Sequence, residues 1–222
     1  MSLLYRPRIF IRGLTPDETK AWGGFQDQNG SSHLFITKID GTGFVDLTPN
    51  GATQSNIRGL TPDGTKAFGE FSDQKNGQFR SFIIKIDGTG FVDLTPQGAT
   101  YAYIRGVTPD GTKAWGNFND QWGHNRAFIT KIDGTGFVDL TPQGETYANI
   151  SGLTPDGTKA WGSFNNQNGQ HPFITKIDGT GFVDLTPSGS TSSTVNGVTL
   201  DGKLFGSYQT SDQKWHGFVT PV

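Results

Sequence analysis

The chain has 222 residues, a formal net charge of −2, 32 glycines, 11 prolines, 17 phenylalanines and no cysteine. Acidic and basic residues are mixed, which argues against nucleic acid as a partner and against a polybasic membrane patch. Without cysteine there are no disulfides or thiolate metal sites, and no apolar run reaches membrane-spanning length. The first eight residues, Met-Ser-Leu-Leu-Tyr-Arg-Pro-Arg, lack the features of a secretory signal.

The chain is built from a repeated segment. Thr-Lys-Ile-Asp-Gly-Thr-Gly-Phe-Val-Asp-Leu-Thr-Pro, at residues 37–49, returns almost unchanged from Ile84, Thr130 and Thr175. The first apolar residues of successive repeats, spaced by 46, 47, 46 and 45 positions, are Ile11, Ile57, Ile104, Ile150 and Val195. A fixed period of this length is typical of repeat architectures. We therefore expect residues 1–222 to form a single domain of five repeats.

Each repeat contains four short segments with strand character. In the first repeat they cover residues 11–15, 20–25, 33–39 and 44–47. The connections, such as Pro-Asp-Gly-Thr and Asp-Gly-Thr-Gly, favour tight turns because Pro fixes φ and Gly adopts positive φ. No segment has helical periodicity. The pattern predicts an all-β fold with four antiparallel strands per repeat, arranged as a closed five-bladed β-propeller.

The two ends of the chain complement each other in this arrangement. The last repeat stops after its third segment, and residues 2–7 stand where the fourth strand of a preceding blade would lie. We therefore expect residues 1–10 to complete the fifth blade, which removes the unpaired edge and favours a monomer. Glycines recur in the first two strands of each repeat, as at Gly13 and Gly23, and are expected to allow close approach of strands around the axis.

The turns that vary between repeats lie at one end of each predicted blade, and loops on a rigid scaffold commonly carry recognition. Two residues before the third-strand phenylalanine, every repeat has a basic or imidazole side chain: His33, Arg80, Arg126, His171 and His216. The preceding turn has a glutamine in every repeat: Gln28, Gln74, Gln121, Gln167 and Gln213. These side chains are either donors for a polar or anionic ligand or caps for neighbouring loops.

Aromatic residues provide a second set of candidates, which we expect in the same variable loops: Tyr101, Tyr103, Trp122, Tyr147 and Trp215. An aromatic face beside polar side chains suits a sugar or a peptide, and the alternative is that each ring covers a neighbouring blade. By contrast, Trp22, Trp115 and Trp161 fall in mid-strand and are expected to pack between blades.

The acidic residues argue against catalysis. All 17 aspartates occupy repeated positions, and only Glu18, Glu70 and Glu145 stand outside the pattern. A glycosidase needs two carboxylates in different environments, and no nucleophile-elbow motif is present. The Asp-Gln-Asn-Gly turn lacks the closing glutamate of a calcium loop. We expect no enzymatic activity, no cofactor and no metal site.

The repeat Gly-Leu-Thr-Pro-Asp-Gly-Thr-Lys-Ala-Trp-Gly, followed by Asp-Gln-Asn-Gly, His-x-Phe and Thr-Pro-x-Gly-Ala-Thr, resembles the extracellular HAF repeat. The resemblance is closest in the last repeat, at residues 206–208 and 216–218, and the chain departs from it where Arg80 and Arg126 replace histidine. The segment Pro-Asp-Gly-Thr-Lys-Ala also resembles the blade signature of TolB-like and WD-type propellers. The HAF resemblance implies a bacterial protein that is extracellular or on the cell surface.

These features predict a non-catalytic, multivalent binding module with lectin-like recognition of carbohydrate. Five weak, equivalent sites gain avidity on repeated glycans, as in five-bladed propeller lectins. Two alternatives remain open. Near-identical repeats also result from recent amplification or design, which favours the first of them. One is a repeat scaffold with no ligand of its own, and the other is a platform for protein–protein interaction.

Overall fold

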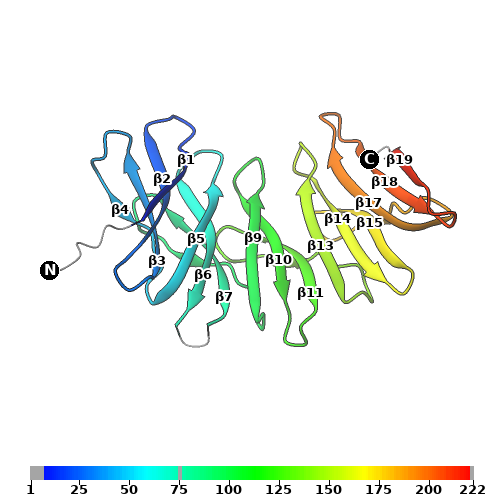
Figure 1. Cartoon of the computed structure of the whole chain (residues 1–222), viewed down its shortest axis with the longest axis horizontal. Coiled ribbons are helices and arrows are strands. Elements are labelled where there is room, and N and C mark those ends of the chain that lie inside the picture. Colours follow the sequence, from blue (N-terminus) through cyan, green and yellow to red (C-terminus); the bar gives the residue numbers. More distant parts are fainter. Residues whose placement is uncertain (1–7, 75–76, 221–222) are drawn as a thin grey trace. The chain divides into compact units, whose positions relative to one another are not determined.

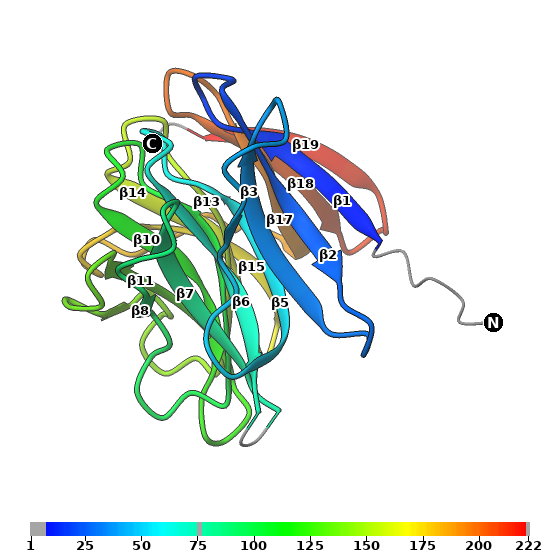
Figure 2. The same cartoon turned by 90° about the vertical axis from the view of Figure 1, so that its left-hand side faces the viewer.

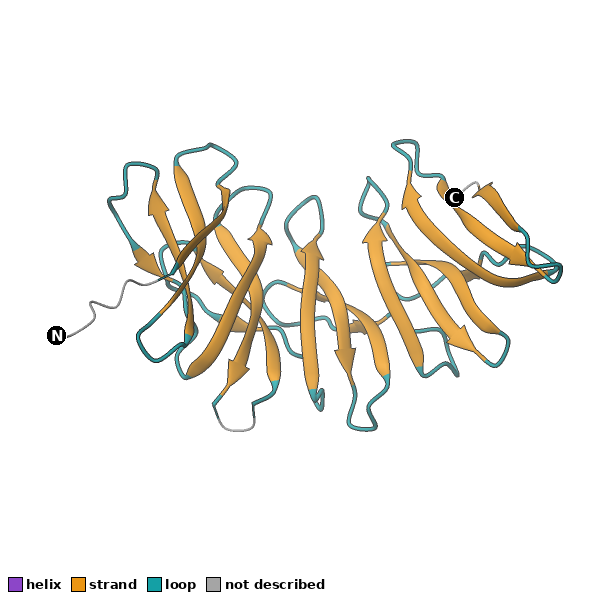
Figure 3. Ribbon diagram, viewed as in Figure 1, coloured by secondary structure: helices purple, strands orange, loops and turns teal. Residues whose placement is uncertain are grey.

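The structure is a computed structural model that describes residues 8–74 and 77–220. These residues form strands and loops and contain no helix, so no described helix could cross a membrane (Figures 1 and 3). The chain divides into two compact units. The first unit is Met1–Ile104 with Ile132–Gly134, and the second unit is Arg105–Lys131 with Thr135–Val222.

The described residues form nineteen strands in five sheets, in which sequential strands are neighbours. The first sheet contains β1 (Ile9–Leu14), β2 (Lys20–Gln26), β3 (Ser32–Lys38) and β4 (Val45–Asp46). The second contains β5 (Ala52–Leu60), β6 (Lys66–Asp73), β7 (Phe79–Lys85) and β8 (Val92–Asp93), and Figures 1 and 2 show β5, β6 and β7 side by side.

The remaining sheets repeat this order. The third contains β9 (Tyr101–Val107), β10 (Lys113–Asn119), β11 (Asn125–Lys131) and β12 (Val138–Asp139). The fourth contains β13 (Tyr147–Leu153), β14 (Lys159–Asn166), β15 (Gly169–Lys176) and β16 (Val183–Asp184). The fifth has three described strands, β17 (Ser190–Val198), β18 (Leu204–Thr210) and β19 (Trp215–Thr220).

The second-strand glycines are required by a bulge in the first strand. In the second sheet the pairing of β5 with β6 shifts between Ile57 and Gly59, so Arg58 is the bulged residue. A Cβ on Gly69 would lie 2.0 Å from the carbonyl oxygen of Asn56, which no side chain could tolerate. The same close approach recurs at Gly23, Gly162 and Gly206.

The first-strand glycines lie against an aromatic ring of the second strand in the same sheet. A Cβ on Gly13 would lie 2.7 Å from the Trp22 ring, and one on Gly152 would lie 2.7 Å from the Trp161 ring. The close approach is thus a contact within each sheet, which differs from the crowding around an axis that we expected. Trp161 also belongs to a buried cluster with Ile174 and Leu204, so it packs between sheets as predicted.

Within each unit, the core lies between neighbouring sheets. In the first unit, Leu34 and Ile36 of β3 and Leu47, which follows β4, pack against the second sheet. The second sheet contributes Ile57, Ala67, Phe71, Phe82 and Ile84 to this cluster. In the second unit, the corresponding cluster of the third and fourth sheets is Ala127, Ile129, Leu140, Ala148, Ile150, Ala160, Phe164 and Phe173. Seven of these residues hold the same repeat positions as in the first unit, and Ala148, at the position of Ser55, is the exception. The repeat therefore encodes its own contact with the next repeat, through alternating apolar residues on each strand.

These sheets confirm the all-β class and, in four of the five repeats, the four antiparallel strands. The strand expected to complete the fifth repeat, at residues 2–7, lies outside the described residues. We had assigned residues 1–10 to that repeat, but Ile9 and Phe10 pair with Phe25 and Gly24 in the first sheet. Strand β1 thus begins two residues before Ile11, because residues upstream of the bulge continue the ladder.

Candidate functional site

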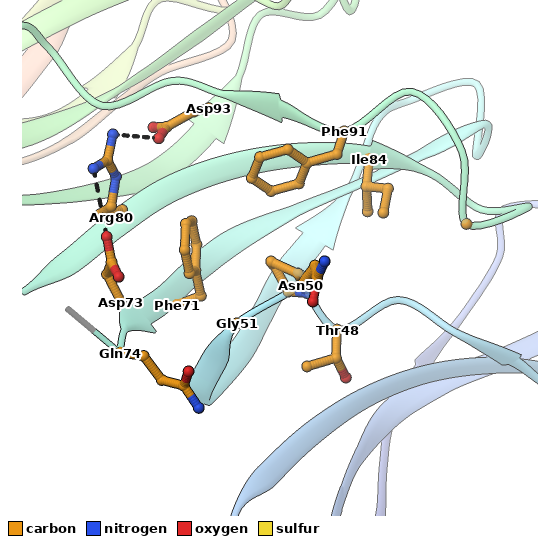
Figure 4. A pocket seen from close by; sticks show the side chains of 12 residues that line it. Thr48, Asn50, Gly51, Phe71, Asp73, Gln74, Arg80, Ile84, Phe91 and Asp93 are labelled. Atoms are coloured by element: carbon orange, nitrogen blue, oxygen red, sulfur yellow. Dashed lines mark ion pairs between the residues drawn. The ribbon is translucent and has the colours of Figure 1, made fainter. Parts of the chain in front are cut away.

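A cleft of about 600 Å³ lies within the first unit, where the connection between the first two sheets passes the second sheet (Figure 4). Its lining comprises Thr48, Pro49, Asn50, Gly51, Phe71, Asp73, Gln74, Arg80, Ile84, Gly88, Phe91 and Asp93. Figure 4 shows Arg80 between Asp73 and Asp93 at one end, and Phe91 with Ile84 at the other. We call this the first cleft.

The second unit contains a cleft of about 580 Å³ in the corresponding place, which we call the second cleft. Nine lining positions of the first cleft recur there, as Thr141, Pro142, Gln143, Phe164, Asn166, Thr175, Gly179, Phe182 and Asp184. Phe91 and Phe182 keep part of their rings open to solvent, at 43% and 40% exposure. The recurrence follows from the repeat, because the connection, the second-strand phenylalanine and the third turn occupy the same positions each time.

In each complete repeat the arginines bind the aspartate of their own fourth strand, whereas the histidines lie closer to the threonine that follows it. His33 Nδ1 is 3.3 Å from Thr48 Oγ1, and His171 Nδ1 is 2.8 Å from Thr186 Oγ1. Arg80 Nη2 lies 2.5 Å from Asp93 Oδ2, and Arg126 Nε donates to Asp139 Oδ2 at 2.7 Å. His33 Nδ1 and His171 Nδ1 lie 3.9 and 3.4 Å from the corresponding aspartates, Asp46 and Asp184. In the last repeat, whose described strands lack a fourth, His216 Nε2 instead lies 3.3 Å from Thr210 Oγ1.

Cross-strand stacking fixes the histidines further. The rings of Phe25 and His33 stack at 4.9 Å, as do Phe164 with His171 and Tyr208 with His216 at 5.1 Å. Such pairs are the usual unit of sheet stabilisation. Arg80 Nε is buried without a hydrogen-bond partner in the described part of the chain. The predicted basic residues are therefore anchored within their own repeats, and Arg80 also lines the first cleft.

The five glutamines occupy exposed turns between the second and third strands: Gln28, Gln74, Gln121, Gln167 and Gln213. In the first of these turns the Asp27 carboxylate accepts from the backbone N–H of Ser31 at 2.9 Å and of Asn29 at 2.8 Å. The bond from Ser31 is the main cause of a lowered pKa at Asp27. Asp27 therefore orders the turn, while Gln28 extends from it into solvent, and Gln74 lines the first cleft.

The aromatic candidates do not lie where we expected. Only Trp122 lies in a turn, with 72% of its surface exposed. Tyr101 and Tyr103 lie in β9, Tyr147 begins β13 and Trp215 begins β19. The prediction that these four residues lie in loops is wrong, because the strands extend to include them, and aromatic residues fit a half-buried strand well. Tyr147 and Trp215 remain exposed, at 39% and 58%.

A polar pair that the sequence interpretation did not assign joins β5 to β6. Glu70 is buried, and its Oε1 lies 2.7 Å from Arg58 Nη2. The signal was present in the sequence, because Glu70 is one of three acidic residues outside the repeat pattern. Across residues 8–74 and 77–220, no group of three or more acidic or histidine side chains is arranged to hold a metal ion.

Solved structures resemble this arrangement of sheets. TolB from Acinetobacter baumannii matches with a TM-score of 0.53 and 18% identity, over 79% of this chain and 42% of that one. The β-propeller domain of the Trilobed protease from Pyrococcus furiosus matches with a TM-score of 0.62 and 8% identity, over 96% and 68%. The chain has a β-propeller fold. Its repeats are blades.

A structure from an analysis of two prolyl endopeptidases also matches, with a TM-score of 0.63 and 14% identity, over 97% of this chain and 34% of that one. The chain thus spans less than half the length of this protein and of the Acinetobacter TolB. No protein-family model matches the sequence. No curated protein matches it either. At these identities the likeness shows the fold alone.

Proposed function

We propose that the chain is a non-catalytic, multivalent binding module whose ligand sites are the clefts between successive blades. One observation carries this proposal: the first and second clefts have nearly the same volume and share nine lining positions. A site that recurs with the repeat offers several equivalent contacts to a repetitive ligand, and linked weak sites gain avidity.

Carbohydrate is the ligand class that the linings favour. The half-exposed rings of Phe91 and Phe182 offer apolar faces, and the amides of Asn50, Gln74 and Gln143 offer both donors and acceptors. Sugars present hydroxyl groups around an apolar ring face, which suits this combination. A protein partner would use the same surfaces.

The test is a glycan array probed with the wild-type chain and with a variant in which Phe91 and Phe182 are both alanine. We expect saturable binding to one glycan class, lost in the double variant. A double variant that binds as tightly as the wild type would overturn the cleft assignment. Binding to no glycan, together with capture of a protein partner that requires the same two rings, would favour the interaction platform instead.

The scaffold alternative is favoured by the anchoring of the basic side chains. Arg80 and Arg126 bind the aspartates of their own blades, as expected for structural caps. Absence of catalysis is part of this proposal. Of the acidic residues outside the repeat pattern, Glu70 already accepts hydrogen bonds from Arg58 and Asn56, so its carboxylate is not free for acid–base chemistry.

We further propose that the five blades close into a monomeric ring, with residues 1–7 as the missing strand of the fifth blade. Ile11, Phe25, Phe35 and Phe44 form an apolar hollow on the first blade, at positions whose equivalents in the second blade are mostly buried against a neighbour. Deletion of residues 1–8 should cause dimerisation or a large loss of stability. A deletion variant that is monomeric and as stable as the wild type would contradict closure.

An extracellular or cell-surface location, implied by the HAF resemblance, is part of the same proposal. It suits a module that binds glycans. Fractionation of cells that produce the natural protein tests it, and recovery only from the cytoplasm would contradict it.

A further inference from the structure

A second polar site lies in the first unit, away from the first cleft. The buried Glu70 side chain, 6% exposed, accepts three hydrogen bonds. Arg58 donates from Nη2 to Oε1 at 2.7 Å and from Nε to Oε2 at 2.9 Å, and Asn56 Nδ2 donates to Oε1 at 3.0 Å. Successive strand residues point to opposite faces, so Glu70 lies on the face of β6 opposite the cleft residue Phe71.

The blade does not need this ion pair in order to fold. The fourth blade has Ser151 and Ser163 at the positions of Arg58 and Glu70, and it forms the same bulge between Ile150 and Gly152. A buried ion pair is weak evidence for stability, because the cost of removing two charges from water offsets their attraction. Stability therefore does not explain why a nearly identical repeat carries Arg58 and Glu70.

Glu70 binds one edge of the Arg58 guanidinium and leaves the other edge without a partner among the described residues. The bulge directs the Arg58 side chain toward Glu70, and that side chain remains 51% exposed. Glu70 occupies Nε and one side of Nη2, and Nη1 has no hydrogen-bond partner among the described residues. The rigid guanidinium therefore presents its Nη1–Nη2 edge, which matches a planar carboxylate with two parallel donors.

Tyr101 lies near this pair, since its phenol interacts electrostatically with both Arg58 and Glu70. A phenol is protonated at neutral pH, and burial and the nearby charge of Glu70 raise the pKa of Tyr101 further. Its ring lies 5.5 Å from that of Tyr103, at an interplanar angle of 72°. The two rings provide apolar surface next to a fixed cationic donor, which is a suitable setting for an organic anion.

We propose that Arg58, positioned by Glu70 and Asn56 and flanked by Tyr101, binds the carboxylate group of a ligand. The group would belong to a sugar acid or to the C-terminus of a peptide. The site is independent of the clefts, since it lies on the other face of β6 and uses none of their lining residues.

The test is an NMR titration of the full chain that follows the Arg58 side-chain Nε–H and the Gly59 amide. The probes are glucuronate and N-acetylglycine, and their neutral counterparts are glucose and N-acetylglycinamide. We expect saturable shifts with one or both carboxylates, and with neither neutral compound. Response to glucuronate alone assigns a sugar acid, and response to N-acetylglycine alone assigns a peptide terminus.

Arg58→Gln should weaken binding by about tenfold or more, because it removes charged hydrogen bonds. Arg12→Gln is the matched control: Arg12 holds the same repeat position, but Gly24 replaces the glutamate there, so binding should not change. If Arg58→Gln does not fold, Arg58→Lys replaces it as the test variant, because lysine keeps the charge and lacks the two parallel donors of the guanidinium. Tight binding by the lysine variant, equal shifts with the neutral compounds, or tighter binding of inorganic phosphate would each overturn the proposal.

Discussion

The first and second clefts share an apolar frame and differ at their polar ends. Phe71 and Phe164 are buried at equivalent positions, and each contacts the half-exposed phenylalanine of its own cleft, Phe91 or Phe182. At the polar end, the first cleft has Asp73 where the second has Asn166. The repeat thus fixes the shape of the cleft through its core, while a few surface substitutions set its charge.

The connection that borders each cleft is held in the same way in both units. Thr48 Oγ1 accepts from the Leu34 backbone N–H at 3.0 Å, and Thr141 Oγ1 accepts from that of Ala127 at 3.1 Å. These hydrogen bonds tie the connection to the third strand of the preceding blade. Because the frame is common to both clefts, a change to the frame should affect both equally, and a change to one lining should affect one cleft alone.

The largest effect should come from Gly69→Ala and Gly162→Ala. In each variant the new Cβ would lie about 2 Å from a backbone carbonyl oxygen, that of Asn56 or of Asn149, so the bulge that joins the first two strands cannot persist. We expect each to lose about 3 kcal/mol or more, measured by urea unfolding.

Gly217→Ala is the matched control, since its Cβ would meet the nearest atom, the Gly206 carbonyl oxygen, at 3.9 Å. That variant should stay within about 0.5 kcal/mol of the wild type. A mild effect of Gly69→Ala together with a severe effect of Gly162→Ala would show that the two blades are not built alike.

A smaller effect, confined to one cleft, should come from Phe91→Ala and Phe182→Ala. Each ring is partly exposed and contacts two phenylalanines, so each variant should lose about 1–2 kcal/mol of stability. Each should also abolish ligand binding at its own cleft and reduce the number of sites measured by calorimetry by one.

Phe137→Ala is the control, because Phe137 holds the same repeat position, is 46% exposed and lines neither cleft. It should lose similar stability and keep both sites. If it abolished binding at the first or second cleft, binding loss in the other variants would reflect stability and not contact.

The sequence predicted most of the strands and turns that form this frame, but it did not predict which polar side chains pair with one another. Turn residues and apolar alternation at a fixed period specify the strands, because each depends on local backbone geometry. The role of Gly69 as the partner of a bulge was not predictable, since it depends on the register between β5 and β6. The same register joins Arg58 to Glu70, which are 12 positions apart in the sequence.

The candidate site was predicted in part. The glutamines lie in the exposed turns that the pattern predicted, and Gln74 and Arg80 line the first cleft. Tyr101 was misplaced because the sequence gives no mark where a strand ends when the next residues also have strand propensity. The aspartates that bind Arg80 and Arg126 belong to the constant segment, so nothing in the variation between repeats pointed to these ion pairs.

The smallest effect should come from the constant turns, where both units have the same chemistry. Thr61 Oγ1 donates to Asp63 at 2.6 Å, and with the bonds from Thr65 this lowers the pKa of Asp63 from 3.8 to about 2. A lowered folded-state pKa contributes stability that is complete above the unfolded value and is lost as pH falls from about 4 to 2. Because the carboxylate is exposed, the contribution should be well below about 1 kcal/mol.

Asp63→Asn and Asp156→Asn should therefore each lower stability slightly at pH 7 and flatten the acid limb of the unfolding curve below pH 4. Asp156 lies in the corresponding turn of the second unit, and its pKa is lowered in the same direction, first by the hydrogen bond from Thr154. Urea midpoints measured from pH 7 to pH 2 check this. Equal, small changes would identify these turns as the invariant part of the repeat, and a steeper acid limb in either variant would contradict the assigned direction of the shift, since removal of a depressed carboxylate removes a source of acid sensitivity.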